Sequence, residues 1–130
     1  MGIKALLDTH ALLWWLLDDP HLSAQARETI ASAANHIFVS SASAWELLTK
    51  HRLGKLPAAG EIVARLPFFI RKERFDILPI SLEHALYAGK LPGPNRDPFD
   101  RMLMAQSVLE MMPIITGDAV FTDYGMAVIW

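Results

Sequence analysis

Short apolar runs alternate along the chain with longer segments in which apolar residues are spaced as on helices. The first run, residues 3–7, is too brief for a helix core and does not alternate with polar residues, a pattern typical of a strand buried on both faces. Four further short runs extend this prediction. The predicted strands are residues 3–7, 36–40, 76–80, 114–115 and 127–130.

The segments between these runs predict helices, and several of their ends carry residues that start or stop a helix. Thr9 and Ser23 are suited to cap the first two helices. Gly54 is suited to the left-handed position after the third, and Pro67 is expected to bend or split the fourth. The predicted helices are residues 9–17, 23–34, 43–53, 61–74, 81–91 and 98–112, with a short helix in the turn 117–124.

This alternation predicts the architecture, because a connection between parallel strands needs a crossover of about a dozen or more residues. We expect an α/β fold of three α/β/α layers around a central, mostly parallel sheet of four to five strands. A chain of 130 residues has the size of one domain, so residues 1–130 are expected to form a single domain. In such sheets ligands bind beyond the carboxyl ends of the strands.

Composition narrows the possible functions. Hydrophobic residues make up 52% of the chain and charged residues 20%, which excludes long-range disorder. The net charge is −2, so any polyanion must be held by a local site and not by a general basic field. The absence of cysteine excludes disulfides, thiolate metal sites and cysteine nucleophiles, and it is compatible with a reducing compartment.

The sequence predicts neither a membrane segment nor an export signal. Its longest apolar run, residues 11–17, is far shorter than the roughly 20 residues that cross a bilayer. Asp8 and His10 interrupt the amino-terminal apolar segment, so we expect no signal peptide and read Met1 as the start of the mature protein. A cytoplasmic location without a membrane partner is the resulting expectation.

Four acidic residues follow predicted strands or stand at the start of predicted helices: Asp8, Glu46, Asp100 and Asp118. Each has a structural explanation when taken alone. Asp8 and Asp118 occupy places where aspartate favours the start of a helix. Glu46 lies three residues after Ser43 and would complete a capping box with it. Asp100 falls in the first turn of a helix that Asp97 is suited to cap.

The joint placement of the four acids favours a metal site. Their carboxylates would converge at one edge of the sheet, where two charges about 4 Å apart repel by roughly 4 kcal/mol at an effective dielectric of about 20. A divalent cation removes that repulsion, and oxygen ligands without thiolates or clustered imidazoles favour Mg²⁺ or Mn²⁺ over zinc. Such an ion can orient water for in-line attack on a phosphodiester.

Five stretches, in order over nearly the whole chain, carry a resemblance to a known family. They are residues 7–14 (LDTHALLW), 41–46 (SASAWE), 96–101 (RDPFDR), 116–118 (TGD) and 124–130 (YGMAVIW). With them the chain resembles the PIN-domain ribonucleases, and most of all the VapC toxins of bacterial toxin–antitoxin pairs. The resemblance implies a Mg²⁺- or Mn²⁺-dependent ribonuclease that cuts RNA, a homodimer, and a cognate VapB-like antitoxin whose tail lies across the acidic pocket.

The same resemblance assigns the catalytic and metal-binding roles to Asp8, Glu46, Asp100 and Asp118. Asp97, one helical turn before Asp100, is a supporting candidate whose capping role is an alternative. Thr9 and Thr116 are candidates for orienting carboxylates or water, with capping as the alternative. Nearby basic side chains are candidates for holding RNA phosphates, with a solvated surface as the alternative: Lys50, Arg52, Lys55, Arg96 and Arg101.

The tryptophans give a further expectation. Trp14 and Trp15 are adjacent, so one helix cannot bury both on the same face. The exposed one would form a hydrophobic patch for a partner, with core packing as the alternative. Trp45 and Trp130 are expected to pack inside.

Other functions compete for the same residues. A phosphatase that forms an aspartyl-phosphate would also place Asp8 after the first strand, but His10 stands where its second acid is required. A receiver-type signalling domain needs a pair of acids after the first strand and a lysine near the last, and neither is present. A catalytically silent RNA- or protein-binding domain of the same fold stays open, and it differs from a nuclease in leaving RNA uncut when metal is added.

Overall fold

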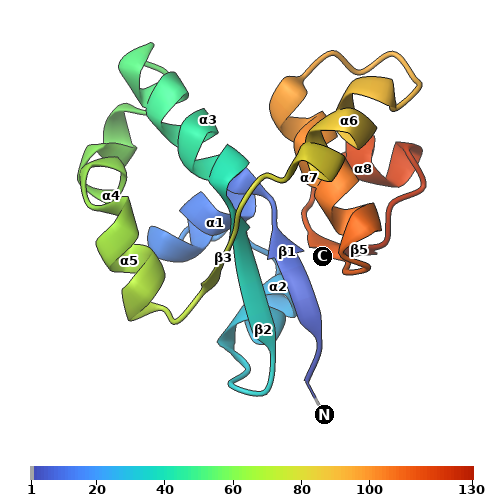
Figure 1. Ribbon diagram of the computed structural model, residues 1–130. Helices are drawn as coiled ribbons and strands as arrows, with labels where there is room; N and C mark the ends of the chain where they lie inside the picture. Colours follow the sequence, from blue (N-terminus) through green and yellow to red (C-terminus); the bar gives the residue numbers. More distant parts are fainter. Residues whose placement is uncertain (1) are drawn as a thin grey trace.

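A parallel sheet of five strands runs through the molecule in the order β3-β2-β1-β4-β5 (Figure 1). The computed structural model describes residues 2–130, so Met1 lies outside it. The strands are β1 (Lys4–Leu7), β2 (His36–Ser40), β3 (Asp76–Leu78), β4 (Ile114–Ile115) and β5 (Val128–Ile129). All neighbouring strands in this order pair in parallel, which confirms the predicted sheet.

Helices connect the strands, as the parallel pairing requires. They are α1 (Thr9–Leu16), α2 (Ala24–Ala31), α3 (Ser41–Arg52), α4 (Gly60–Ala64), α5 (Leu66–Lys72), α6 (Leu82–Lys90), α7 (Pro98–Leu109) and α8 (Ala119–Asp123), with a short 3₁₀ helix at Pro57–Ala59. Ser23 accepts a hydrogen bond from the Ala26 amide and so caps α2 as predicted. The helix predicted at 61–74 is split next to Pro67 into α4 and α5.

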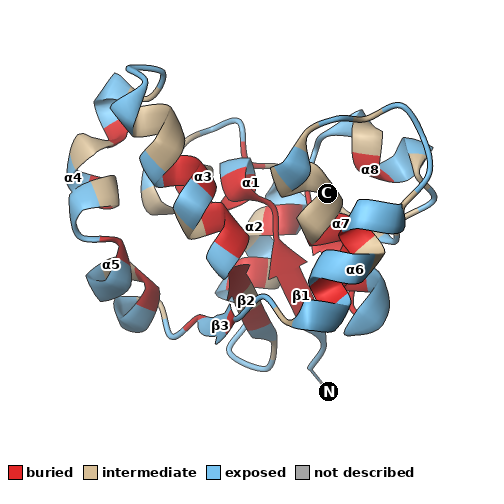
Figure 2. Ribbon diagram, turned by 45° about the horizontal axis from the view of Figure 1, so that its top comes forward, coloured by how far each residue is buried: buried red, intermediate tan, exposed pale blue. Residues whose placement is uncertain are grey.

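Alternate residues of β1 enter two different apolar cores, which establishes the three layers. Ala5 and Leu7 pack in the core formed with α1 to α5, whereas Leu6 packs with residues of α7 and α8 on the opposite face of the sheet. Figure 2 shows the buried central strands between outer helix faces that are exposed. The predicted α/β/α arrangement is therefore confirmed.

Some boundaries differ from the prediction for identifiable reasons. β3 ends at Leu78 and not at residue 80, because Pro79 has no amide hydrogen to donate to a strand ladder. α7 ends at Leu109 and not at residue 112, and Met111 just beyond it has a φ of 53°, outside the helical region. α3 begins at Ser41, two residues earlier than predicted, because β2 passes into it without a loop.

The strand register brings residues far apart in sequence to one edge of the sheet. Leu7 of β1 pairs with Ile115 of β4, so Asp8 and Thr116 leave neighbouring strands side by side. Ser40 ends β2 on the other side of β1 and leads into α3. Of the helices between residues 2 and 130, none has both the length and the apolar character needed to cross a membrane.

Candidate active site

Asp8 is a buried acid at this edge of the sheet. It stands at the N-cap position of α1, but its side chain makes no capping hydrogen bond and is 5% exposed. Its Oδ2 instead accepts a hydrogen bond of 2.9 Å from Oγ1 of Thr116. Burial raises the pKa of Asp8, and the charge of Glu46 adds to this, whereas the Thr116 hydrogen bond, the nearby His10 and the Thr9 amide lower it. The carboxylate is therefore held in place without the capping role that would explain it structurally.

The predicted cap at Thr9 is wrong, because the helix begins one residue earlier than that role requires. Asp8 takes the N-cap position and Thr9 is the first residue of α1. The buried Thr9 hydroxyl donates to Oγ of Ser43 over 2.9 Å, which joins α1 to α3. Thr9 thus helps to fix the position of the helix that carries Glu46.

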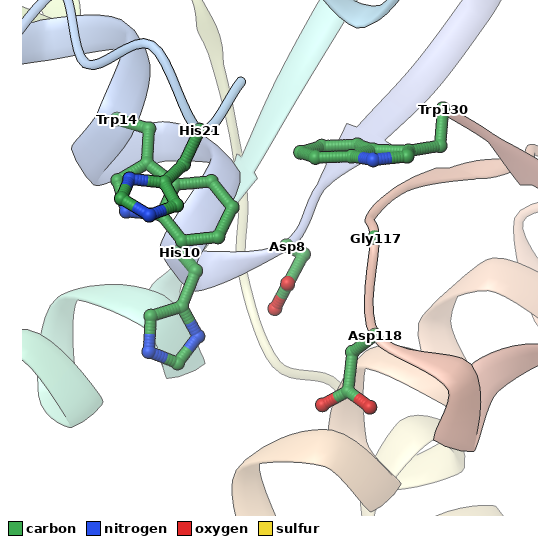
Figure 3. Close-up of a pocket in the computed structure, with 7 residues that line it drawn as sticks. All are labelled: Asp8, His10, Trp14, His21, Gly117, Asp118 and Trp130. Atoms are coloured by element: carbon green, nitrogen blue, oxygen red, sulfur yellow. The ribbon is translucent and has the colours of Figure 1, made fainter. Parts of the chain in front are cut away.

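Thr116 and Asp118 follow β4. The Thr116 hydroxyl accepts a hydrogen bond of 3.0 Å from the Asp118 amide while it donates to Asp8, so one side chain connects both acids. Oδ1 of Asp118 accepts from the Val120 amide at 3.0 Å, which confirms the predicted cap of α8. Asp118 is exposed. Figure 3 shows its carboxylate and that of Asp8 pointing into the same space.

Asp97 and Asp100 lie at the start of α7. Oδ1 of Asp97 accepts from the amides of Phe99 at 2.9 Å and Asp100 at 3.3 Å, as predicted for the cap before Pro98. Burial raises the pKa of Asp100 to about 7, with the charges of Asp97, Asp8 and Asp118 raising it and a hydrogen bond from Asn95 lowering it. The pKa of Asp100 is therefore raised by the charges of three other acids.

Glu46 does not form the predicted capping box with Ser43. Ser40 caps α3, by accepting a hydrogen bond from the Ala42 amide, so Ser43 already lies inside the helix. Glu46 is 3% exposed and pairs with Lys50, one helical turn later. The pKa of Lys50 is raised; burial opposes this shift, whereas its hydrogen bond to Glu46 and the charges of Glu46, Asp97 and Asp100 cause it. Lys50 therefore pairs with Glu46 and lies in the electrostatic field of Asp97 and Asp100.

The basic residues predicted to hold RNA have different surroundings. Arg52, Lys55 and Arg96 are exposed, as a phosphate-binding side chain would be. Arg101 donates to the backbone carbonyl oxygens of Ala88, Leu91 and Asn95. It therefore holds the loop before α7, a structural role that the sequence did not indicate.

The donor set at this edge of the sheet fits a hard divalent cation in its chemistry. All donors are carboxylate or hydroxyl oxygens, and the raised pKa values of Asp8 and Asp100 show that their negative charges are poorly compensated. Within residues 2–130, no three histidine, aspartate or glutamate side chains lie close enough to form a ready metal-binding group. The structure therefore brings the four predicted acids into electrostatic contact but does not cluster them.

Aromatic side chains border the acids on one side, and sequence reasoning missed their position. Trp14 lies with ring centroids 5.4 Å from His21 and 5.9 Å from Trp130 (Figure 3). Both Trp14 and Trp15 are half-buried against the core, which favours core packing, the alternative left open, over an exposed patch. The advance indications were the stretches 7–14 and 124–130, each of which ends in tryptophan.

The expectation for the other two tryptophans is half right. Trp130 is half-buried and packs against the core, as expected. Trp45 is 61% exposed, which contradicts its predicted burial. It lies on the outer side of α3 and meets Phe99 of α7 edge to face, with centroids 4.9 Å apart. Ala44 and Leu47 carry the apolar contacts of α3 to the core, so Trp45 is not needed there.

Comparison with known proteins finds a family model and a curated protein that are similar to this chain in sequence. The PIN domain family model matches residues 5–126. A curated protein, Ribonuclease VapC16 of Mycobacterium tuberculosis, is 37% identical over 70 residues, which are 51% of this chain and 48% of that protein. The chain thus spans about half the length of this curated relative.

Solved structures share the fold at low sequence identity. The structure of VapBC2 from Rickettsia felis bound to a DNA fragment from its promoter has a TM-score of 0.70 at 19% identity, covering 96% of both chains. VapBC-1 from nontypeable Haemophilus influenzae has a TM-score of 0.63 at 16% identity and the same coverage. FitAB bound to an IR36 DNA fragment has a TM-score of 0.57 at 20% identity, covering 95% of this chain and 92% of that one.

Proposed function

Because the chain belongs to the PIN domain family, we propose that it is a ribonuclease that hydrolyses RNA phosphodiester bonds with a bound Mg²⁺ or Mn²⁺ ion. The name of its curated relative, a VapC ribonuclease, supports RNA as the substrate. We further propose that it acts inside the cell as the toxin of a toxin–antitoxin pair, and that residues 1–130 form one PIN domain.

One observation carries the proposal: Asp8 is buried at a helix start and does not cap the helix. A carboxylate in that position ordinarily accepts backbone amide hydrogens, which offset its burial. The Asp8 side chain accepts from Thr116 and makes no capping bond to α1, and its pKa stays raised although the Thr9 amide lowers it. A bound cation would provide the missing compensation.

We assign the ion to four carboxylates: Asp8, Glu46, Asp100 and Asp118. When bound, a Mg²⁺ or Mn²⁺ ion supplies Lewis-acid activation of water and stabilisation of the leaving oxygen. Asp8 and Asp100 are the acids whose raised pKa values favour this assignment. Asp97 supports Asp100 through the cap of α7 and through its charge.

The remaining residues of the site orient these acids. Thr116 holds the Asp8 carboxylate with its hydroxyl and, through the same oxygen, holds the turn that carries Asp118. Thr9 links α1 to α3 through Ser43, which lies about one helical turn before Glu46. Lys50 neutralises Glu46 and lies in the field of Asp97 and Asp100, so it also lowers the repulsion that an incoming phosphate meets.

We assign RNA phosphates to exposed basic residues at the end of α3, just after it, and in the loop before α7: Arg52, Lys55 and Arg96. Arg101 is left out of this set because its guanidinium already donates to three backbone carbonyls. With a net charge of −2, these local side chains are the source of phosphate attraction.

We propose a VapB-like antitoxin as protein partner, because the similar solved structures include VapBC assemblies. The surface that fits an apolar segment of such a partner is a cavity of about 380 Å³ between β2, α3, α4 and α5. Leu48 and Ile77 at this cavity are 49% and 58% exposed and give it an apolar border. We also propose a homodimer, for which sedimentation should give twice the mass of 14.5 kDa.

The experiment that tests the nuclease uses purified protein free of any antitoxin on mixed RNA, with Mg²⁺, Mn²⁺ or EDTA. We expect fragments with either metal and none with EDTA. Cleavage that persists in the Asp8→Asn and Asp100→Asn variants would point to a contaminant or to another site. A folded protein that binds RNA but never cuts it would favour the catalytically silent domain.

A further inference from the structure

A cavity of about 270 Å³ opens directly beside the acidic residues, and its walls are mostly aromatic (Figure 3). Trp14, His10 and His21 border it on the α1 side, and Trp130 covers the other side. Asp8 and Asp118 form the end that the cavity shares with the proposed metal site. An occupant of this cavity would therefore be in contact with the catalytic acids.

The rings on the α1 side are held in a fixed arrangement. His21 stacks on Trp14 with 5.4 Å between centroids and 26° between planes. Asp19 orients that imidazole, because Oδ1 lies 2.7 Å from Nδ1 of His21 and also accepts from the His21 amide at 2.8 Å. Trp14 is thereby supported from one side, while Trp130 lies 5.9 Å away at 52°.

Trp130 is held at the rim of the cavity by a close approach to Gly117. A Cβ atom added to Gly117 would lie 2.6 Å from Cε2 of the indole, closer than real contacts allow. The indole therefore packs directly on the peptide backbone between Thr116 and Asp118. This contact ties the aromatic wall to the turn that carries one of the acids.

The chemistry of the lining selects a flat and uncharged group. Among the described residues that line the cavity there is no lysine or arginine, and aromatic rings make up most of its wall. The volume lies just below the about 300–1,000 Å³ of sites for larger organic ligands, which suits a single ring system. Proteins that recognise single-stranded RNA hold splayed bases by stacking them on aromatic side chains.

We propose that this cavity holds one base of single-stranded RNA, stacked against Trp130 with Trp14 beside it, in the nucleotide next to the bond that is cut. The inference rests on the proposed ribonuclease function, since it assigns the substrate class of the same site. It makes Trp130 a substrate-binding residue. The base is then bound in the cavity, whereas exposed basic side chains elsewhere bind the phosphates.

The test measures RNA binding apart from cleavage, in the Asp100→Asn background. The probes are fluorescein-labelled single-stranded RNA octamers of randomised sequence and octamers with the same sugar-phosphate backbone but no bases. Trp130→Leu removes the aromatic face and keeps apolar bulk, whereas Trp130→Phe keeps an aromatic ring. Phe68→Leu changes an exposed aromatic residue of α5 outside the cavity and serves as the matched control.

We expect Trp130→Leu to weaken binding of the base-bearing octamers about ten-fold or more, in line with the loss of one stacked base. Trp130→Phe and Phe68→Leu should stay within about three-fold of the parent, and the baseless octamers should bind all four proteins alike. Unchanged binding by Trp130→Leu, an equal loss for both probes, or no measurable RNA binding by the parent would overturn the proposal.

Cleavage by the protein with Asp100 intact, measured in parallel, separates the two proposals. If the protein cuts RNA with metal but its RNA binding does not depend on Trp130, the proposed base site is wrong and the proposed nuclease activity stands. If RNA binding depends on Trp130 but no cleavage occurs, the proposed nuclease activity is wrong and the proposed base site stands. Circular dichroism on each variant distinguishes a lost contact from a lost fold.

Discussion

Thr116 donates a hydrogen bond of 2.9 Å to Asp8 across 108 positions of sequence. The bond is possible because β1 and β4 are neighbours in the sheet, with Leu7 paired to Ile115. It connects the amino-terminal acid of the site to the turn that carries Asp118, since the same hydroxyl accepts from the Asp118 amide. One buried side chain thus sets the relative position of two of the proposed metal ligands.

Replacing Thr116 by valine keeps the shape of the side chain and removes its hydroxyl. We expect metal affinity, measured by Mn²⁺ titration calorimetry, to fall about 10- to 100-fold because Asp8 loses its orienting partner. The free energy of unfolding should fall by about 1–3 kcal/mol, since the Asp118 amide also loses its acceptor. Thr116→Ser should restore most of the affinity, and a Thr116→Val protein with unchanged Mn²⁺ affinity would show that the hydroxyl has no positioning role.

Asp100→Asn is nearly isosteric and removes one negative charge from the site. We expect RNA cleavage to fall about 100-fold or more, because even the loss of an outer partner of a metal ligand costs about 10- to 100-fold. The fold should persist, as α7 is capped by Asp97. Gel analysis of RNA fragments with Mn²⁺, together with circular dichroism, measures both. Full cleavage by this variant contradicts the assignment of Asp100.

The pKa of Asp100 also predicts how the stability of metal-free protein depends on pH. The folded-state pKa is about 7, above the ordinary value of 3.8, so between these values the folded state binds more protons than the unfolded state. Stability therefore decreases as pH rises from about 4 to about 7, and the loss is complete above the folded pKa. Thermal unfolding in EDTA between pH 5 and pH 8 should show this loss in the wild type.

Asp100→Asn is the control for that measurement, because it removes the Asp100 carboxyl and leaves every other titratable side chain in place. The difference in melting temperature between the variant and the wild type should grow in favour of the variant as pH rises. A difference that is constant with pH would mean that Asp100 ionises near its ordinary pKa. Added Mn²⁺ should remove the wild-type loss by binding the ionised form.

Lys50→Met leaves the buried Glu46 carboxylate without its partner. We expect the free energy of unfolding in EDTA to fall by about 1–3 kcal/mol, because a buried charge is left uncompensated beside other acids. Lys55→Met, at an exposed position five residues later, should change it by less than about 0.5 kcal/mol. Urea titration measures both. Equal stability of the two variants would show that the Lys50–Glu46 pair does not hold the site together.

Much of this arrangement could be predicted from local patterns. Asp8, Asp97 and Asp118 stand next to strand ends and helix starts that apolar runs and proline mark in the sequence. Their approach to one another then follows from the parallel topology, because the carboxyl ends of parallel strands share one edge. Strands 36–40 and 114–115 were predicted with the bounds that the structure gives them.

Other features depend on how elements pack, which local patterns do not report. The Ser43 to Glu46 spacing fits a capping box, but α3 starts at Ser41 because β2 leads into it directly, so Glu46 was free to pair with Lys50. The position of Trp130 depends on β5 pairing with β4 and on the close approach to Gly117. Neither contact leaves a periodic trace in the sequence.

The central place of β1 in the sheet has a consequence for biosynthesis. β1 is made first, but its neighbour β4 and the threonine that holds Asp8 are made more than a hundred residues later. A nascent chain on the ribosome therefore carries Asp8 without its partner until the segment from β4 onward has emerged. Translation itself therefore delays completion of the Asp8–Thr116 contact, and with it of the proposed metal site, until β4 and the residues after it are exposed.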